Sequence, residues 1–245
     1  LDKSDFEVLV IDNASSDNTY QIVEKFYNKN LNIKYHYESK LGLHAGRHRG
    51  IRESKSEILV FCDDDIIATK DWLKSIKETF YDKEIAIVGG NCYPLFLGTQ
   101  PEWVNQMWEI KDKNGNQSIP FYSVQKRENG IYEISPYFIW GCNFSIRKSI
   151  LYQAEGFHPD GMPESKKFYR GDGETSISKY IQQNSLKSVF NSSASVYHKV
   201  TQSRMTLEYL KKRGFNQGLS DSYSDARNRK IIFFLKMRQF WVNKY

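Results

Sequence analysis

The chain has 245 residues, of which 40% are hydrophobic and 15% aromatic, so it can bury the core of one large α/β domain or of one domain with an appendage. Its formal net charge of +6 predicts anionic partners such as nucleotide phosphates or lipid head groups. No apolar run approaches the length of a transmembrane helix, and the three cysteines lack metal-ligand spacing. We therefore expect a cytoplasmic protein, at most peripheral at the inner face of the membrane.

Apolar runs alternate with helical spacing over the first part of the chain. The runs at 6–11 and 58–62 both end in acidic residues, as buried parallel strands do at the crevice where α/β sheets bind ligands. A helix is expected from about Lys70 to Phe80. This alternation predicts an α/β fold with a mostly parallel sheet flanked by helices. Further expected elements are a helix around 22–27, strands at 33–37 and 85–91, and a short basic helix after the glycine-punctuated loop that starts at Leu41.

The second half of the chain is less regular. Residues 94–131 are aromatic and contain Pro and Gly, so we expect a long excursion over the site. Ordered sequence returns at 137–147, a helix starts near Glu174, and 205–223 has a helical pattern. The last stretch, 224–245, predicts a basic amphipathic helix. Through 227–245 such a helix can lie on an anionic membrane surface or pack on a partner, and the alternative is docking on its own domain.

Three consecutive carboxylates, Asp63 to Asp65, follow the second apolar run. Such acids repel one another unless a cation neutralises them, and oxygen ligands suit Mg²⁺ bound together with substrate phosphates. Asp12 ends the first run, and acids that follow separate parallel strands converge on one crevice. Arg47 offers a planar guanidinium for a phosphate or a base oxygen. The alternative is a polar turn at the triplet, a helix cap at Asp12 and a solvated Arg47.

Several stretches of the chain carry motifs, beginning with 8–19, which contains Asp12, and 41–51, which contains Arg47. The first looks like the nucleotide-binding motif of GT-A fold glycosyltransferases of family 2. The second is similar to the Ala-Arg-Asn-x-Gly segment of that family, with His48 where Asn is usual. The triplet at Asp63 resembles the Asp-x-Asp metal motif of the family. The stretch 140–149 resembles the strand that begins the acceptor half, and 196–200 a later block in which His can complete the metal shell. The resemblance covers the chain roughly to residue 218.

The resemblance implies an inverting transfer of a hexosyl-type sugar from a nucleotide-diphosphate sugar, with UDP favoured, to a hydroxyl on a glycan or lipid-linked glycan. It also implies Mg²⁺ or Mn²⁺ on the diphosphate and a GT-A domain over 1–223. Residues 1–93 would be its nucleotide-sugar-binding half and 94–223 its acceptor half. The implied nucleotide-binding residues are Asp12, Asn13, Arg47, Asp63 and Asp64, the metal ligands Asp65 and His198, and the acceptor-binding residues Trp140 and Asn143.

Two departures from the family pattern affect these expectations. The family ordinarily begins with a strand and a helix ahead of the Asp12 strand, so we expect either a fragment or a partner segment between the strands at 6–11 and 58–62. Direct pairing of those two strands would overturn that expectation. The second departure is Thr175, which stands where the family carries its second acid. Because Thr is no base at neutral pH, the role falls to Glu174, which we favour, or to Asp172. The alternative for either acid is a stabiliser of a helix N-terminus.

Two other classes of function stay open at this point. One is a catalytically silent module that binds nucleotide sugar or polysaccharide, which the missing second acid at Thr175 makes plausible. The other is a basic nucleic-acid-binding protein, suggested by the net charge. That second class has no use for acids placed at strand ends, which would repel phosphate, and no nucleic-acid partner is expected.

Overall fold

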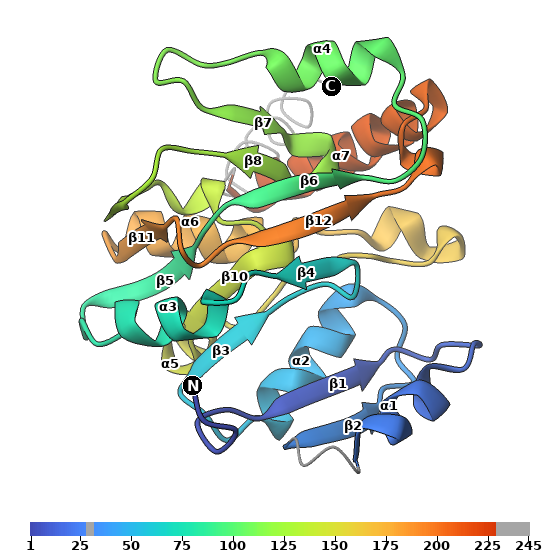
Figure 1. Ribbon diagram of the computed structural model, residues 1–245. Coiled ribbons are helices and arrows are strands. Elements are labelled where there is room, and N and C mark those ends of the chain that lie inside the picture. Colours follow the sequence, from blue (N-terminus) through green and yellow to red (C-terminus); the bar gives the residue numbers. More distant parts are fainter. Residues whose placement is uncertain (28–31, 229–245) are drawn as a thin grey trace, which may run out of the picture.

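A computed structural model describes residues 1–27 and 32–228, arranged as helices around three β-sheets (Figure 1). The central five-stranded sheet has the order β3-β10-β5-β11-β9. Its middle strand, β5, is buried at all five positions, because it has a partner on each edge and a hydrophobic cluster on each face. The strands are β3 (Ile58–Phe61), β5 (Ile85–Gly89), β9 (Ile131–Glu133), β10 (Phe144–Arg147) and β11 (Lys187–Asn191).

The direction of the strands in this sheet is mixed. β10 is antiparallel to both β3 and β5, and β5 is parallel to β11, so β3, β5 and β11 run the same way. The predicted α/β class is confirmed, and the antiparallel pairings come from β10 and β9. Alternate residues of β5 face opposite sides, with Ile87 in one hydrophobic cluster and Val88 in the other. Four helices contribute to these clusters: α2 (Leu43–Glu53), α3 (Trp72–Thr79), α5 (Lys148–Gln153) and α6 (Thr175–Gln183).

A second five-stranded sheet, β4-β12-β6-β8-β7, forms from much of the stretch that the sequence pattern left unassigned. The expectation of an excursion without regular structure over 94–131 is therefore wrong. The helix at 102–109 and the short strands at 117–119 and 124–126 lie there. They surround a separate hydrophobic cluster that contains Val104, Ile119 and Val124, all fully buried. Strands of three residues are too short to show a period. The elements are β4 (Ile66–Ala68), β6 (Cys92–Phe96), α4 (Glu102–Glu109), β7 (Gln117–Ile119), β8 (Val124–Lys126) and β12 (Val196–Val200).

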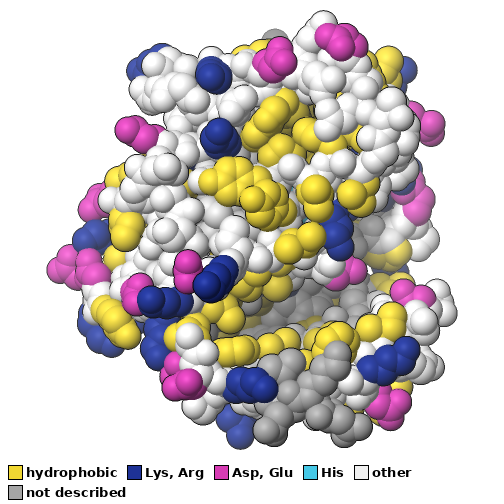
Figure 2. Space-filling model, viewed as in Figure 1, with side chains coloured by type: hydrophobic (Ala, Val, Ile, Leu, Met, Phe, Trp, Pro, Cys, Tyr) yellow, Lys and Arg dark blue, Asp and Glu magenta, His cyan; other side chains and the backbone are white. Residues whose placement is uncertain are grey.

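The N-terminal layer consists of β1 (Val8–Asp12) paired in parallel with β2 (Ile33–Tyr37), together with α1 (Thr19–Tyr27) and α2 (Leu43–Glu53). β1 and β3 are not paired with each other, and no strand within 1–27 and 32–228 occupies the remaining edge of either. Direct pairing of these strands is thus absent from the described structure. Figure 2 shows this face of the molecule hollowed between β1 and the strands above it, with hydrophobic side chains along both lips.

The last described element is α7 (Leu207–Asn228), which continues beyond the predicted end at Tyr223. The helix predicted over 224–245 therefore begins as part of α7, and residues 229–245 lie outside the described residues. Between residues 1 and 228, leaving aside 28–31, no helix is long and apolar enough to cross a bilayer.

Candidate active site

A polar pocket lies where α2, the central sheet and α7 meet. It is lined from α2, from the end of β3, from the segment before β10, from the 156–173 loop with the start of α6, and from α7. Its lining sets three guanidinium groups against four carboxylates, so the pocket is charged but nearly balanced. The arginines are Arg47, Arg170 and Arg213, and the acids are Asp63, Asp160, Asp172 and Glu174.

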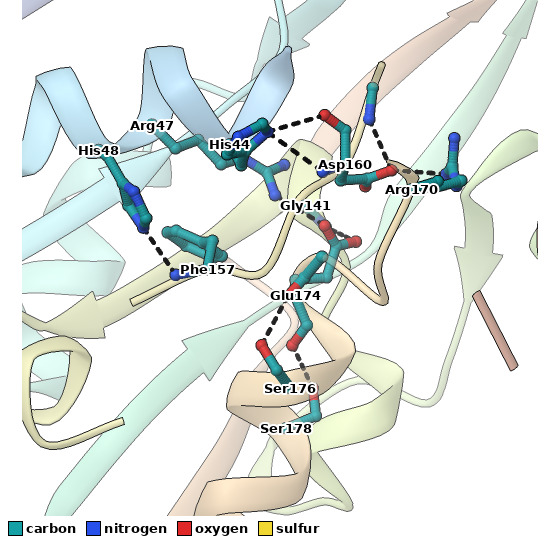
Figure 3. Close-up of polar contacts among 12 residues, drawn as sticks. His44, Arg47, His48, Gly141, Phe157, Asp160, Arg170, Glu174, Ser176 and Ser178 are labelled. Carbon is teal, nitrogen blue, oxygen red and sulfur yellow. Dashed lines mark hydrogen bonds and ion pairs between the residues drawn. The ribbon is translucent and has the colours of Figure 1, made fainter. Parts of the chain in front are cut away.

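An ion pair between Arg47 and Glu174 joins the N-terminal layer to α6. Arg47 Nη1 lies 2.7 Å from Glu174 Oε2, and the Gly141 N–H donates to Glu174 Oε1 at 3.1 Å (Figure 3). Burial alone would raise the pKa of Glu174, but the Arg47 charge and these hydrogen bonds outweigh it and lower the pKa. Glu174 is therefore a carboxylate at neutral pH, facing the pocket from the N-terminus of α6.

Gly141 leaves room for this ion pair. A Cβ at Gly141 would collide with the Arg47 guanidinium and would lie 2.8 Å from Glu174 Oε2, closer than real Cβ contacts come. The absence of a side chain lets the backbone N–H reach the carboxylate. The segment before β10 therefore contributes a backbone donor to the pocket, and a larger residue there would displace the paired ends of Arg47 and Glu174.

The 156–173 loop closes another side of the pocket through Asp160. Arg170 Nη2 lies 2.6 Å from Asp160 Oδ1, and the buried His44 ring lies 3.3 Å from the Asp160 backbone. Arg170 Nε also donates to Ser220 Oγ of α7 at 3.1 Å. Burial raises the pKa of Asp160, while the Arg170 charge opposes that shift. Figure 3 shows Asp160 between His44 and Arg170. Together with the bond to Ser220, these contacts hold the loop between α2 and α7.

Asp172 also faces the pocket, but both of its carboxylate oxygens contact residues that do not line the pocket. One contacts His158 Nδ1, and the other accepts a hydrogen bond from the Ser224 hydroxyl of α7. Burial would raise the pKa of Asp172, and the hydrogen bonds with His158 and Ser224 outweigh it, so the pKa is lowered. Asp172 thus attaches α7 to the loop, whereas Glu174 is held by groups of the pocket itself.

Asp63, Asp65 and His198 form a cluster whose ligand atoms all lie within 4.8 Å of one another. The turn between β3 and β4 carries the two acids, and His198 pairs with Ile66 across the sheet, which brings the three together. Among the described residues, the buried Asp65 Oδ1 accepts no hydrogen bond, although His198 Nε2 lies 3.1 Å away. His198 Nδ1 lies 2.8 Å from the Tyr122 carbonyl oxygen. Donation from Nδ1 leaves a lone pair on Nε2.

These donors fit a divalent cation. An imidazole nitrogen and a carboxylate oxygen that face each other without a hydrogen bond are satisfied by a cation between them, and one His with two carboxylates suits Mn²⁺ or Mg²⁺. Arg204 Nη2 holds the other oxygen of Asp65 at 2.9 Å. Burial raises the pKa of Asp63 and would raise that of Asp65, where the charge and hydrogen bond of Arg204 oppose the shift and help to lower the pKa.

Asp12 and Asn13 end β1, outside the pocket lining. Asp12 Oδ2 accepts from the Tyr35 hydroxyl at 2.6 Å, and its Oδ1 accepts from the Ser15 N–H at 2.8 Å. Asn13 binds the loop that leads to α2: its Oδ1 accepts from the Gly42 N–H at 2.8 Å, and its amide donates to Lys40 O at 2.6 Å. The Asn13 side chain therefore holds the loop beside α2, whereas that of Asp12 ties the end of β1 to β2 and to the following turn.

The remaining predicted residues lie in different surroundings. Asp64 is exposed, while its neighbours in the triplet are half-buried. Trp140 packs against the hydrophobic cluster around Val88, and its Nε1 donates to the Tyr137 carbonyl at 3.0 Å. Asn143 is 1% exposed; its amide donates to Ala194 O and accepts from Trp72 Nε1. Asn143 therefore connects core segments in this structure, and its acceptor role stays a prediction.

Comparison with known proteins gives the family of the chain. The family model described as glycosyl transferase family 2 matches residues 1–154. This chain belongs to that family. Glycosyltransferase AglE of Haloferax volcanii is 37% identical over 131 residues, which is 52% of this chain and 42% of that protein. The cholesterol galactosyltransferase of Borreliella burgdorferi is 24% identical over 96% of this chain and 66% of that protein.

The solved structure of GalNAc-T7 with UDP, GalNAc and Mn²⁺ supports the same fold. It has a TM-score of 0.57 at 16% identity and covers 79% of this chain and 38% of that chain. The predicted GT-A fold of a family 2 protein is thereby confirmed. The chain spans 42% of the length of AglE, so the activity of the complete protein is treated below as a proposal.

Sequence reasoning missed most of the polar groups that complete the site. Asp160, Arg170, His158 and Arg213 come from a polar loop and from α7, where nothing in the local pattern distinguishes them from solvated residues. Arg204 carried a signal, because it follows the His198 block closely along the chain. Its contact with Asp65 at 2.9 Å is the reason to group it with the cluster.

Proposed function

We propose that this family 2 protein is an inverting glycosyltransferase that moves a sugar from a nucleotide-diphosphate sugar, with UDP favoured, to an acceptor hydroxyl. The observation that carries the proposal is the position of Asp63. It belongs to the Asp–Asp–His cluster and also lines the pocket that contains Arg47 and Glu174. A group suited to a metal-bound diphosphate thus adjoins a pocket with a carboxylate that can take a proton.

The donor would lie across the end of β1 and the acid cluster. Asp65 and His198 would hold Mg²⁺ or Mn²⁺, with Asp63 close by, and a cation there would stabilise charge on the departing diphosphate, which is the Lewis-acid role. Asp12 would accept a hydrogen bond from the base or ribose, and Arg47 would meet a phosphate or sugar oxygen. Asn13 and Asp64 would contribute on the nucleotide side. The GalNAc-T7 structure, with UDP and Mn²⁺, supports this choice of donor class and metal.

Glu174 is the proposed base. Its carboxylate would take the proton of the acceptor hydroxyl while that oxygen forms a bond to the anomeric carbon and the bond from that carbon to the diphosphate oxygen breaks. Attack from the face opposite the leaving group inverts the anomeric centre. Arg47 keeps Glu174 ionised and oriented before the acceptor enters. Trp140, which lies beside Gly141 at the pocket, would contact the acceptor.

A lipid-linked acceptor at the cytoplasmic face of a membrane is the acceptor class that we favour. The Borreliella relative is named for transfer to cholesterol, a lipid. The protein carries a formal net charge of +6, which suits a substrate near anionic head groups.

A thermal-shift screen of nucleotide sugars, with and without Mn²⁺, tests donor and metal together. A ligand that binds only the folded state raises the melting temperature, so we expect stabilisation by a UDP-sugar that depends on Mn²⁺. Asp65→Asn should lose the dependence on Mn²⁺, because it removes a ligand. A flat response to every donor contradicts the proposal.

Two matched variants test the base. Glu174→Gln should lower the transfer rate by about 10²–10⁴-fold, the range for removal of a general base, while keeping donor-dependent stabilisation. Asp172→Asn should keep most of the rate. The reverse result would assign the base to Asp172. Full donor binding with no transfer or donor hydrolysis in the unaltered protein would instead support the silent binding module that Thr175 suggests.

A further inference from the structure

An exposed pair of aromatic side chains stands at the rim of the pocket. Phe168 and Tyr169 end the short helix η4 (Glu164–Tyr169) and are 71% and 73% exposed, the largest values among the aromatic residues of the described chain. The next residue, Arg170, lines the pocket. Neighbouring large apolar side chains that remain in water mark a surface that binds something.

Lysines surround this pair. Lys166 and Lys167 belong to the same short helix, and Lys167 Nζ lies 5.4 Å from the centre of the Phe168 ring. Lys212 of α7 reaches the helix from the other side, with its Nζ 3.3 Å from Glu164 Oε2. We call Lys166, Lys167, Phe168, Tyr169 and Lys212 the aromatic–basic rim. It combines two rings with three lysines, of which Lys167 and Lys212 are both ion-paired with Glu164, at 2.7 Å and 3.3 Å, so the rim with Glu164 keeps a net positive charge.

One apolar side chain, Leu43, lies at the pocket where it meets α2. Leu43 lines the pocket and is 38% exposed, and the 156–173 loop touches it, because a Cβ on Gly161 would lie 2.6 Å from Leu43 Cβ. The loop therefore runs from α2 to α7 across the pocket with its aromatic end outward. Figure 1 shows this loop and α7 on one side of the molecule and α5 on the other.

We propose that the aromatic–basic rim docks on an anionic lipid surface, with Phe168 and Tyr169 in the head-group region and the lysines beside acidic head groups. Aromatic side chains are favoured in the head-group region, because the body of the ring is apolar while its polar edge can contact water. Lysines near that region are attracted to anionic lipid. A soluble acidic polymer would engage the lysines but would leave both rings in water. Docking brings the pocket mouth to the head-group plane. It goes beyond the proposed transfer, which does not require it.

Vesicle co-sedimentation of the full chain tests the proposal. The vesicles contain phosphatidylcholine alone, or with roughly a third phosphatidylglycerol, a strongly anionic surface. We expect binding to the anionic vesicles only. The double variant Phe168→Ala/Tyr169→Ala should weaken that binding by about tenfold, since it removes both interfacial rings. Lys166→Gln/Lys167→Gln should weaken it as well and should reduce its dependence on salt.

Tyr152→Ala is the matched control. Tyr152 is 61% exposed and has Lys148 Nζ 5.8 Å from its ring, so it repeats the local chemistry of the rim on α5, away from the pocket. It should bind vesicles like the unaltered protein. Residues 229–245 are the same in every variant, so a difference between variants reports on the rim. Thermal melting should confirm that both aromatic variants are folded, as expected for exposed side chains.

Two results would overturn the proposal: equal vesicle binding by the rim variant and the unaltered protein, or equal loss of binding in Tyr152→Ala. Binding to soluble polyglutamate that competes fully with vesicles would point to an acidic polymer instead. The outcome is separable from the transferase proposal. Glu174→Gln should still bind vesicles, and Phe168→Ala/Tyr169→Ala should still show donor stabilisation with Mn²⁺.

Discussion

Strands β1 and β5 have similar apolar sequences, Val-Leu-Val-Ile-Asp and Ile-Ala-Ile-Val-Gly, and different environments. All five residues of β5 are buried, between β10 and β11. In β1 only Asp12 is buried and Val8 is 36% exposed, because its one described partner is β2. An apolar run therefore predicts a strand, whereas the burial of that strand depends on how many of its edges and faces are covered.

The N-terminal layer and the central sheet both contribute side chains to the pocket. Arg47 belongs to the thin layer of β1, β2 and α2, and Glu174 belongs to the side of the pocket built on the central sheet. The two groups meet at 2.7 Å. The ion pair therefore couples the less protected layer to the well-packed one, and each prediction below tests how different the two layers are.

Hydrogen exchange should show the largest contrast. Val8 N–H donates to Asn32 O and Asp12 O accepts from Glu38 N–H, so strand alternation turns the Leu9 and Ile11 N–H groups toward the unpaired edge. We expect these two amides to exchange about a thousandfold faster than Ile87 and Val88 of β5, as measured by NMR. Equal protection would show that the edge of β1 is covered in solution.

Truncation of one buried side chain in each layer should give a smaller contrast. Ile87 is fully buried, so Ile87→Ala should lower the free energy of unfolding by roughly 2–5 kcal/mol. Val10 is half-buried, so Val10→Ala should lower it by about 1 kcal/mol. Urea unfolding followed by circular dichroism measures both. Similar losses would mean that β1 is packed as tightly as β5.

The pH dependence of the Arg47–Glu174 ion pair should give the smallest effect. Because the pKa of Glu174 is lower in the folded state than its ordinary value, the pair stabilises the fold above the ordinary glutamate range and loses that contribution as the pH falls through the folded pKa. Glu174→Gln should therefore be less stable by about 1 kcal/mol at neutral pH. That deficit should shrink in acid, as thermal melting from neutral to acidic pH would show. A constant deficit would contradict an ionic role.

Much of the framework could be predicted from local sequence. The apolar runs became β1, β3 and β5, and α3 lies within the predicted Lys70 to Phe80. Asp65 and His198, assigned together by resemblance, do lie 3.1 Å apart. These predictions rest on strand ends and periodicity, which act over a few residues.

What could not be predicted depends on contacts between distant parts of the chain. The reversal of β10 between β3 and β5 is set by which strands pair, and no local pattern reports that. Asn143 follows Gly141 closely in sequence, yet its side chain lies in the core while Gly141 lines the pocket. The engagement of Asp172 with His158 and Ser224 likewise needs α7 to fold back on the loop.

The pairing pattern also has a consequence for folding kinetics. In the N-terminal layer Val8 pairs with Ile33, within a short contiguous stretch, whereas in the central sheet Val88 pairs with Val189 and Phe61 with Phe144. Closing a short loop is faster than closing a long one, and distant pairings slow folding. The β1–β2 unit should therefore form early and reversibly during refolding, and the rate-limiting step should be the insertion of β10 that completes the sheet beneath the active site.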